Sequence, residues 1–478
     1  MNQTNTPLFS KLQQFTMKDP VSFHVPGHKN GQVFSEEGVD FYKQMLRLDL
    51  TELSGLDDLH APSGVIQEAE QLAAEFFKAE KTFFLVGGST VGNLAMVLAT
   101  CHSGDKVIVQ RNCHKSIMNA LELSGAHPIF IAPEYDSNVD RYTSIGFTTL
   151  THSLERYPDA KAVVLTYPDY FGRTYEIKRM IELTHEYGIP VLVDEAHGVH
   201  FSLDNGFPTS ALQLGADVVV QSAHKMAPAM TQGSYLHIKS RFILKERVAH
   251  YLQMLQSSSP SYPLMASLDL ARAFLAAITP RDMRKIKQSV ECVRGMLNKS
   301  DLWDVLPLTE YDDFLKITLH VKQRYSIQKV VNLLETENIF PELHTNNQIL
   351  LIHGLAPFNS TERLEKAIKR INEQLKNDRN HATIDITKLF TEKIQELALS
   401  YQVMNQLTYI EAPIEKGIGN IAAEAIIPYP PGIPLILKGE RITEKNVRIL
   451  KHLLKQGVRI QQRIQNIKIY TNEQRSTF

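Results

Sequence analysis

The sequence predicts an α/β fold in which a large, mostly parallel sheet is followed by a smaller α+β region. Short apolar runs rich in β-branched residues recur from about residue 80, and segments with helical spacing separate them. After about residue 275 this alternation stops and the chain becomes more charged. Parallel strands joined by helices are covered on both faces, which explains why the runs are almost continuously apolar.

The apolar runs have the length and composition of buried strands. They lie at 81–87, 105–110, 127–132, 160–167, 189–194 and 216–222. Helical spacing lies between them at 92–101, 116–125 and 176–188. In open α/β sheets, ligands bind outside the carboxyl ends of the strands. The residues that directly follow each strand are therefore the candidates for a functional site.

The second half of the chain has a different pattern. Strands are expected at 312–321 and 347–355, after a charged helix. The polar stretch 375–385 is a candidate linker, and the prolines of 426–443 predict a rigid extended loop. We expect four parts, bounded as an N-terminal segment, a large domain, a small α+β domain and a C-terminal domain at 1–60, 61–275, 276–380 and 386–478.

Composition excludes several classes of protein. The 478 residues include 51 Lys and Arg against 52 Asp and Glu, so the bulk attraction typical of a nucleic-acid-binding protein is missing. The three cysteines have no metal-binding spacing and fit a reducing compartment better than a disulfide framework. There is no signal-peptide pattern, and no apolar run approaches the roughly 18 residues of a membrane helix. We expect a soluble cytoplasmic protein without nucleic-acid or membrane partners.

Four of the predicted strands are followed by polar residues, and "RNCHKS" (111–116) follows the strand at 105–110. "GGST" (87–90) stands between a strand and a helix, where exposed N–H groups and hydroxyls can bind phosphate. The alternative is an ordinary tight turn in which Ser89 or Thr90 caps the helix. "DEAHG" (194–198) and "SAHK" (222–225) follow two later strands.

Two other interpretations of these residues find less support. "DEAH" also occurs in nucleic-acid helicases, but that function requires a phosphate loop ending in Gly-Lys, and the chain contains no Gly-Lys dipeptide. His24 and His28 have the spacing of a helical zinc pair, but Pro26 and Gly27 lie between them and make a continuous helix unfavourable. We expect no metal site.

Taken together, the residues that follow the strands match the needs of pyridoxal phosphate. A lysine bonds with the aldehyde, a carboxylate keeps the ring nitrogen protonated, and a Ser/Thr turn holds the phosphate. Lys225, Asp194 and the "GGST" turn supply these groups. A neighbouring cation such as His224 would keep the lysine amine neutral. The alternative for Lys225 is a solvated surface lysine.

Several motifs then match a known family in order along the chain. They are "FHVPGHKNG" (23–31), "LDLTELSGLDDLHAPSGVI" (48–66), "FFLVGGSTVGN" (83–93), "RNCHKS" (111–116), "VDEAHG" (193–198), "SAHK" (222–225), "SSSPSY" (257–262) and "PYPPGIPLILKGE" (428–440). With them the chain resembles the fold type I pyridoxal-phosphate-dependent decarboxylases of ornithine, lysine and arginine. The resemblance implies a seven-stranded sheet in a cofactor-binding domain at 61–275, and a C-terminal decarboxylase domain at 386–478.

The resemblance also implies roles for individual residues. Lys225 matches the covalent anchor of the cofactor, Asp194 the partner of the ring nitrogen, and His114 the side chain that stacks on the ring. Ala196 would face the other side of the ring, where only a small side chain fits. Glu424 is a candidate to bind the distal cation of the substrate. The remaining cofactor-binding candidates are Gly88, Ser89, Thr90, His197, Ser222, His224 and Ser258, the last reaching the phosphate of a neighbouring subunit.

The chain departs from the family pattern in two places. "FHVPGHKNG" begins at residue 23, so we do not expect the N-terminal receiver-like domain of the large inducible members or their ring-shaped assembly. The phosphate turn reads "VGGST" where "VNGST" is expected, and the backbone can supply the contacts at Gly87. "TYPDYFG" (166–172) lacks the Asn-Pro pair of aminotransferases, which favours decarboxylation.

The expected reaction is the α-decarboxylation of a basic amino acid by a homodimer or higher homo-oligomer with its active site at the subunit interface. Arginine, giving agmatine for polyamine biosynthesis, is the expected substrate. Lysine, giving cadaverine, and ornithine, giving putrescine, are the alternatives. Another reaction on the same scaffold, such as transamination or aldol cleavage, and an inactive cofactor-binding regulatory protein are further alternatives.

Overall fold

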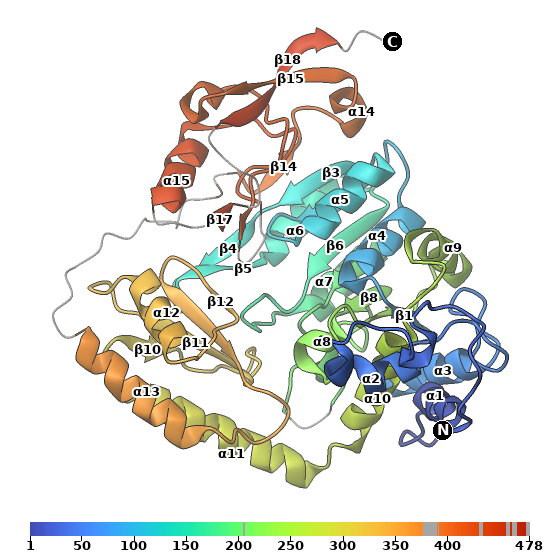
Figure 1. Cartoon of the computed structure of the whole chain (residues 1–478). Helices are drawn as coiled ribbons and strands as arrows, with labels where there is room; N and C mark the ends of the chain where they lie inside the picture. The colour runs from blue at the N-terminus through green and yellow to red at the C-terminus, as the bar shows by residue number, and fades with distance from the viewer. Residues whose placement is uncertain are drawn as a thin grey trace. The chain divides into compact units, whose positions relative to one another are not determined.

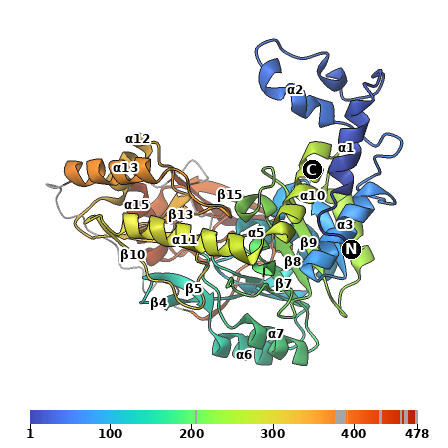
Figure 2. The ribbon, with the colours of Figure 1, turned by 90° about the horizontal axis from the view of Figure 1, so that it is seen from below.

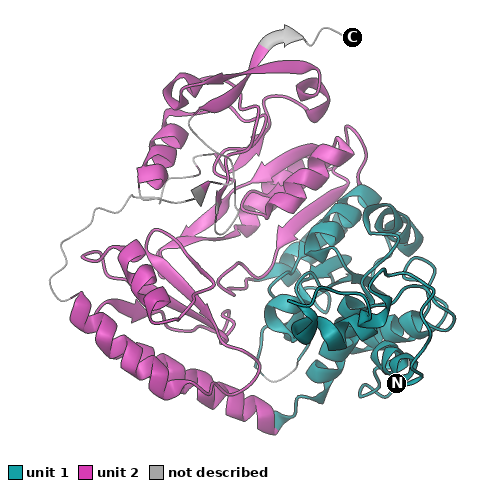
Figure 3. Ribbon diagram, in the orientation of Figure 1, with its two compact units in different colours: residues 1–100, 176–280 teal, residues 101–175, 281–478 magenta. Residues whose placement is uncertain are grey.

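The computed structural model of the chain describes residues 1–203, 206–375, 390, 392–429, 434–455, 459–460 and 466–474. The chain divides into two compact units, one formed by residues 1–100 and 176–280 and the other by residues 101–175 and 281–478 (Figure 3). Both units are discontinuous in sequence, since the chain leaves the first unit after residue 100 and returns to it at residue 176.

The first unit is built on four neighbouring strands, in the order β1 (Lys81–Leu85), β9 (Ser234–Ile238), β8 (Val218–Gln221) and β7 (Val191–Asp194). β7 and β8 are parallel, whereas β9 is antiparallel to β8 and to β1. Every residue of β7, β8 and β9 is buried. Strands covered on both faces need continuous apolar runs, which is the pattern that predicted β7 and β8.

Figure 1 shows the helices of the first unit together with this sheet. They are α1 (Pro7–Met17), η1 (Lys29–Gly31), α2 (Val39–Leu48), α3 (Val65–Phe77), α4 (Gly88–Thr100), α7 (Ile177–Glu186), η2 (Val199–Ser202), α8 (Ala223–Met226), α9 (Lys245–Leu255) and α10 (Tyr262–Ala277). α4 contacts all four strands, so it lies across the sheet. α10 packs against α1 and α3 and is mostly buried.

The N-terminal part of the first unit leaves many apolar side chains exposed. Figure 2 shows α2 and its flanking loops projecting from the rest of this unit. Val21, Phe23 and Phe41 are 82%, 92% and 88% exposed, and Met17 and Val25 are also exposed. A set of large exposed apolar residues this close together in sequence is typical of an interaction surface.

The second unit contains the strands β6 (Ala162–Thr166), β2 (Lys106–Gln110), β3 (His127–Ile131) and β14 (Ile394–Glu396), which neighbour one another in that order. β2 is parallel to β6 and β3, and β14 is antiparallel to β3. Its other elements near this sheet are α5 (Lys115–Ser124), the hairpin β4 (Pro133–Asp136) and β5 (Arg141–Ile145), and α6 (Phe147–Arg156).

The second unit also contains an antiparallel four-stranded sheet with helices. Its strands, in spatial order, are β10 (Trp303–Val305), β11 (Lys316–Val321), β13 (Gln348–Ile352) and β12 (Leu343–His344). Its helices are α11 (Pro280–Leu297), α12 (Ile327–Thr336) and α13 (Thr361–Gln374).

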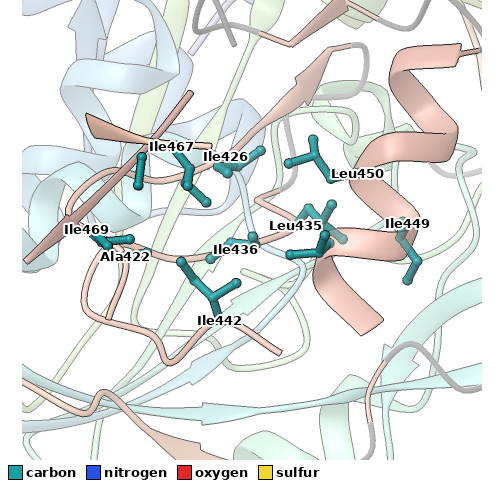
Figure 4. Packing of buried hydrophobic residues seen from close by; sticks show 11 residues of the cluster. Ala422, Ile426, Leu435, Ile436, Ile442, Ile449, Leu450, Ile467 and Ile469 are labelled. Carbon is teal, nitrogen blue, oxygen red and sulfur yellow. The ribbon is translucent and has the colours of Figure 1, made fainter. Parts of the chain in front are cut away.

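The C-terminal part of the second unit has its own buried core. Its elements are α14 (Tyr401–Met404), β15 (Leu407–Ala412), η3 (Ile414–Gly417), β16 (Pro428–Tyr429), α15 (Glu444–Lys455), β17 (Arg459–Ile460) and β18 (Ile467–Gln474). Ala422, Ile436 and Leu450 are fully buried, and Ile426 and Ile467 pack with them in one apolar cluster (Figure 4).

The α/β class and the large, mostly parallel sheet predicted from the sequence are confirmed. The predicted strands 312–321 and 347–355 correspond to β11 and β13. β9 and β14 were not predicted. Most of the predicted linker at 375–385 lies outside the described residues, and so do residues 430–433 of the predicted proline loop. The four domain boundaries stay a prediction.

Candidate active site

The turn between β1 and α4 combines a glycine in the left-handed region with the start of a helix. Gly88 has a φ of +75°, which a residue with a side chain rarely adopts. A Cβ atom on Gly87 would lie 2.5 Å from Val91 Cγ2, so a larger residue would displace that side chain. Ser89 and Thr90 form the first turn of α4, where backbone N–H groups have no partner within the helix. The turn therefore offers N–H groups and hydroxyls to an anion.

Ser89 joins this turn to the end of β8. Its Oγ lies 2.7 Å from the Oγ of Ser222, the residue that follows β8, and 3.4 Å from the Oγ of Ser234. Ser222 is buried and Ser89 is half-buried. Two of the predicted phosphate ligands, which are far apart in sequence, are thus in direct contact.

Asp194 is the last residue of β7 and is 3% exposed. Asn93 Nδ2 donates a hydrogen bond of 2.9 Å to Asp194 Oδ2, and the N–H of Ala196 donates one of 3.2 Å to Oδ1. The carboxylate is therefore held at both oxygens. Asn93 lies one turn after Ser89 on α4, so the same helix contacts Asp194 through Asn93 and Ser222 through Ser89.

Close packing of α4 on the sheet makes these contacts possible. A Cβ atom on Gly92 would lie 2.7 Å from both Leu85 Cδ1 and Val220 Cγ1. Only glycine lets the helix approach the strands this closely.

Lys225 lies on α8, directly after β8, and is half-buried. Its Nζ is 3.1 Å from Nε2 of His197, which is 4% exposed. His224 Nδ1 lies 3.0 Å from the backbone oxygen of Gly233, to which it donates. The sequence assigned His197 to the cofactor, but it did not predict the contact between His197 and the lysine amine.

Ser258 lies in the exposed loop between α9 and α10. His60 Nε2 donates a hydrogen bond of 2.8 Å to the backbone oxygen of the neighbouring Ser257. His60 belongs to a loop organised by Asp57, whose carboxylate accepts hydrogen bonds from the N–H groups of Ser63 and Gly64 at 2.8 Å and 2.7 Å. These hydrogen bonds lower the pKa of Asp57, although burial opposes the shift.

Two predicted site residues belong to the second unit. His114 caps the start of α5, where Nδ1 accepts hydrogen bonds from the N–H of Ser116 at 3.3 Å and from its hydroxyl at 2.8 Å. An accepting Nδ1 leaves the proton of the neutral ring on Nε2. Glu424 Oε2 lies 3.3 Å from Lys468 Nζ, and this pairing raises the pKa of Lys468. The predicted ligand of the substrate cation is thus paired with a lysine of its own unit.

The groups gathered in the first unit fit pyridoxal phosphate. The glycine turn and the hydroxyls of Ser89 and Ser222 suit a phosphate, the buried Asp194 suits a protonated ring nitrogen, and Lys225 supplies an amine. This fold and this set of groups are those of the class of enzymes that use pyridoxal phosphate.

Comparison with known families identifies the branch of this class. The family model of the Orn/Lys/Arg decarboxylase major domain matches residues 6–310, and that of the Orn/Lys/Arg decarboxylase C-terminal domain matches residues 385–463. The chain belongs to the Orn/Lys/Arg decarboxylase family. It is therefore a pyridoxal-phosphate-dependent enzyme that decarboxylates a basic amino acid.

Similar proteins match over almost the whole chain. An arginine decarboxylase of Bacillus subtilis (strain 168) is 37% identical over 96% of this chain and 96% of its own length. An uncharacterized protein of the same organism is 43% identical over 99% of this chain and 100% of its own length. The lysine decarboxylase LdcA of Pseudomonas aeruginosa is 26% identical over 94% of this chain and 75% of its own length.

Solved structures show the same fold. The constitutive lysine decarboxylase of Escherichia coli superposes with a TM-score of 0.79 at 20% identity, covering 98% of this chain and 82% of that one. A serine palmitoyltransferase of Sphingomonas wittichii gives a TM-score of 0.52 at 19% identity, covering 72% of this chain and 85% of that one. Among the described residues, no helix is long and apolar enough to cross a membrane.

Proposed function

We propose that the chain converts L-arginine into agmatine and CO2. Near-complete alignment with proteins named arginine decarboxylase carries this proposal, since the relatives from Bacillus subtilis (strain 168) and Bacillus anthracis are 37% and 36% identical to the chain. The matched lysine decarboxylases of Pseudomonas aeruginosa and Escherichia coli are 26% and 23% identical. Identity over the whole chain therefore favours arginine over lysine.

Pyridoxal phosphate, when bound, supplies an electron sink for the pair of electrons left on Cα by the departing carboxylate. Lys225 Nζ is the proposed covalent anchor. Asp194, held by Asn93 and Ala196, would keep a proton on the ring nitrogen and so preserve the positive charge of the ring. Ala196 leaves space for the ring because its side chain is a single methyl group.

The phosphate would bind at the first turn of α4. The N–H groups that begin this helix, the hydroxyls of Ser89, Thr90 and Ser222, and the His224 ring are the proposed ligands. The short distance between the Oγ atoms of Ser89 and Ser222 supports the assignment, because both hydroxyls could then donate to the oxygens of the same phosphate group. His114 is proposed to stack on the ring, with its orientation fixed by the hydrogen bonds to Ser116.

The reaction consumes one proton, since the C–CO2 bond breaks with its electrons and Cα takes up a proton in place of the carboxylate. Lys225 and His197 are the proposed proton carriers. Their side-chain nitrogens lie 3.1 Å apart, so the two groups can share a proton.

We propose that the enzyme is a homodimer with shared active sites. Ser258 lies in an exposed loop and is proposed to reach the phosphate in the partner subunit. The exposed apolar side chains of the N-terminal segment, among them Phe23 and Phe41, are the proposed contact surface. Glu424 is proposed to bind the guanidinium of arginine in exchange for its pairing with Lys468.

The proposed reaction is tested by identifying the product. The purified protein with pyridoxal phosphate is given arginine, lysine and ornithine separately and at equal concentration, and CO2, amines and keto acids are measured. We expect agmatine to form with the highest kcat/KM. The Lys225→Ala variant, assayed in parallel as the control, should form no product. Cadaverine or putrescine as the main product would contradict arginine as the substrate. A keto acid formed without CO2 would contradict decarboxylation.

A further inference from the structure

A chain of buried polar side chains crosses the four strands of the first unit. Thr82 lies on β1, His237 on β9 and Gln221 on β8, and Glu195 directly follows β7. Thr82 Oγ1 is 2.8 Å from His237 Nδ1, His237 Nε2 is 3.0 Å from Gln221 Oε1, and Gln221 Nε2 is 2.5 Å from Glu195 Oε2. Each of the four residues is at most 1% exposed. Burying so many polar groups costs free energy unless all are paired, so this chain of polar side chains needs an explanation.

When Glu195 is ionised, the hydrogen bonds of this polar chain have one consistent set of directions. Gln221 donates its amide N–H to the Glu195 carboxylate, so its oxygen faces His237. His237 Nε2 must therefore donate to that oxygen, and His237 Nδ1 accepts from the Thr82 hydroxyl. Burial lowers the pKa of His237 to about 3, so the ring is neutral and can play both parts. Every donor thus has an acceptor.

Glu195 collects two more donors at the end of this polar chain. Its Oε1 accepts a hydrogen bond of 2.7 Å from the N–H of Ala211, and its Oε2 accepts one of 3.0 Å from the hydroxyl of Ser210. Space for the side chain depends on Gly198, because a Cβ atom there would lie 2.6 Å from Glu195 Cγ. The carboxyl group therefore ties the end of β7 to β8 and to the segment that contains Ser210.

The polar chain and the candidate cofactor site use neighbouring residues on opposite faces of the sheet. Side chains alternate between faces along a strand, so Glu195 and Gln221 point away from Asp194 and Ser222. Asp194 and Ser222 contact Asn93 and Ser89 of α4, which covers their face. Glu195 is joined by one peptide bond to Asp194, and Gln221 by one peptide bond to Ser222. A displaced backbone at Glu195 or Gln221 would therefore also displace the neighbouring proposed cofactor ligand.

We propose that Glu195 and Gln221 are positioning residues for the cofactor. They lock the carboxyl ends of β7 and β8 together, and so hold Asp194 and Ser222 at the separation that one bound pyridoxal phosphate requires. The inference rests on the proposed assignment of Asp194 and Ser222 to the cofactor. Neither Glu195 nor Gln221 contacts the cofactor in this arrangement.

The same two strands provide a matched control at their other end. Asp217 precedes β8, is 2% exposed, and accepts hydrogen bonds of 2.9 Å from the N–H of Val191 and 2.6 Å from the hydroxyl of Ser240. His185 Nε2 lies 2.8 Å from the same carboxylate. Asp217 resembles Glu195 in burial and in its number of partners, but it lies at the amino end of the strands, away from Asp194 and Ser222.

The experiment compares Glu195→Ala with Asp217→Ala in the full-length chain. Thermal unfolding gives Tm, and titration of the apoenzyme with pyridoxal phosphate, followed by the visible absorbance of the bound cofactor, gives Kd. We expect both variants to lower Tm, and only Glu195→Ala to raise the Kd for pyridoxal phosphate, by about tenfold or more. Equal changes of Kd in the two variants, or none in Glu195→Ala, would overturn the proposal.

Two further variants keep the proposal testable if Glu195→Ala does not fold. Gln221→Met breaks the same link, leaves Glu195 with Ala211 and Ser210, and should also raise Kd. Glu195→Gln can be accommodated because every hydrogen bond of the polar chain can reverse its direction, so it should restore Kd to within about threefold of the wild type. A Gln221→Met variant with unchanged Kd would contradict the proposal.

The readout does not depend on the substrate. If the wild type binds pyridoxal phosphate but does not decarboxylate arginine, the proposed reaction is wrong and the positioning role stands. If the wild type decarboxylates arginine and Glu195→Ala binds the cofactor as tightly as Asp217→Ala does, the positioning role is wrong and the proposed reaction stands.

Discussion

At the scale of single residues, Asp194 depends on the groups that orient it. Asn93 donates to one carboxylate oxygen over 2.9 Å and Ala196 donates to the other over 3.2 Å. A buried hydrogen bond to a charged group contributes about 1.5–3 kcal/mol. An Asp194 side chain that loses one of these donors can rotate, and it then loses its alignment with the ring nitrogen in the proposed site.

We expect Asn93→Ala to lower kcat/KM for the amino-acid substrate by about tenfold or more, because one buried hydrogen bond to Asp194 is lost. Steady-state kinetics with saturating pyridoxal phosphate measures the effect. Asn332→Ala, on the exposed surface of α12, serves as the control and should leave kcat/KM unchanged. An Asn93→Ala enzyme with full activity and a lowered Tm would show that Asn93 is only structural.

The sequence identified the residues with distinctive chemistry but not their supports. Lys225 and Asp194 could be predicted because a lysine and an acid after buried strands are unusual. Asn93 stands at the helical spacing i+4 from Ser89, a signal that was present but lay inside an apolar helix. The partners of Glu195 could not be predicted, because Gln221 and Ser210 are far from it in sequence. The pairing of β7 with β8 brings Gln221 close to it, and the loop before β8 brings Ser210.

At the scale of elements, the four strands of the first unit contain two buried titratable groups with opposite pKa shifts. Burial raises the pKa of Glu195 from 4.5 to about 8, so its contribution to stability is complete below pH 4.5 and is lost as the pH rises to about 8. Burial lowers the pKa of His237 from 6.5 to about 3, so its contribution is complete above pH 6.5 and is lost as the pH falls. Between pH 4.5 and 6.5 the two effects oppose each other.

We therefore expect the wild type to lose stability relative to Glu195→Gln as the pH rises from 5 to 8. The difference in the free energy of unfolding between the two proteins should change by roughly 4 kcal/mol, at about 1.4 kcal/mol for each pKa unit. Denaturant unfolding of both proteins at pH 5 and pH 8, at one cofactor concentration, measures it. Parallel pH dependence of the two proteins would mean that Glu195 does not titrate in this range.

At the scale of the whole molecule, the exposed apolar side chains of the N-terminal segment call for a partner surface. Phe23 and Phe41 are almost fully exposed, an arrangement that is unfavourable in a monomer that stays soluble. The sequence placed this segment outside the large domain but carried no signal for its exposure, because burial depends on which distant parts of the chain pack against the segment. The strand β9 was also missed, since its "SYLHI" run follows a turn rather than a helix.

We expect the wild type to sediment as a dimer, and the double variant Phe23→Ser, Phe41→Ser to sediment mainly as a monomer at micromolar concentration. Loss of two large apolar contacts weakens association, and sedimentation velocity measures it. Leu244→Ser removes another exposed apolar side chain of the same unit and should stay dimeric. A wild-type monomer, or a dimeric double variant, would contradict the proposed contact surface.

α4 packs closely on the sheet and carries two site residues whose separation is set by the helix geometry. Ser89 and Asn93 are four residues apart, which corresponds to about 6 Å along the helix axis at roughly 1.5 Å per residue. In the proposed binding mode, the first residue marks the phosphate end of the cofactor and the second marks the ring-nitrogen end through Asp194. Because both residues belong to one helix, their separation is constant. An analogue of pyridoxal phosphate with a longer phosphate arm should therefore fail to reach one of the two positions.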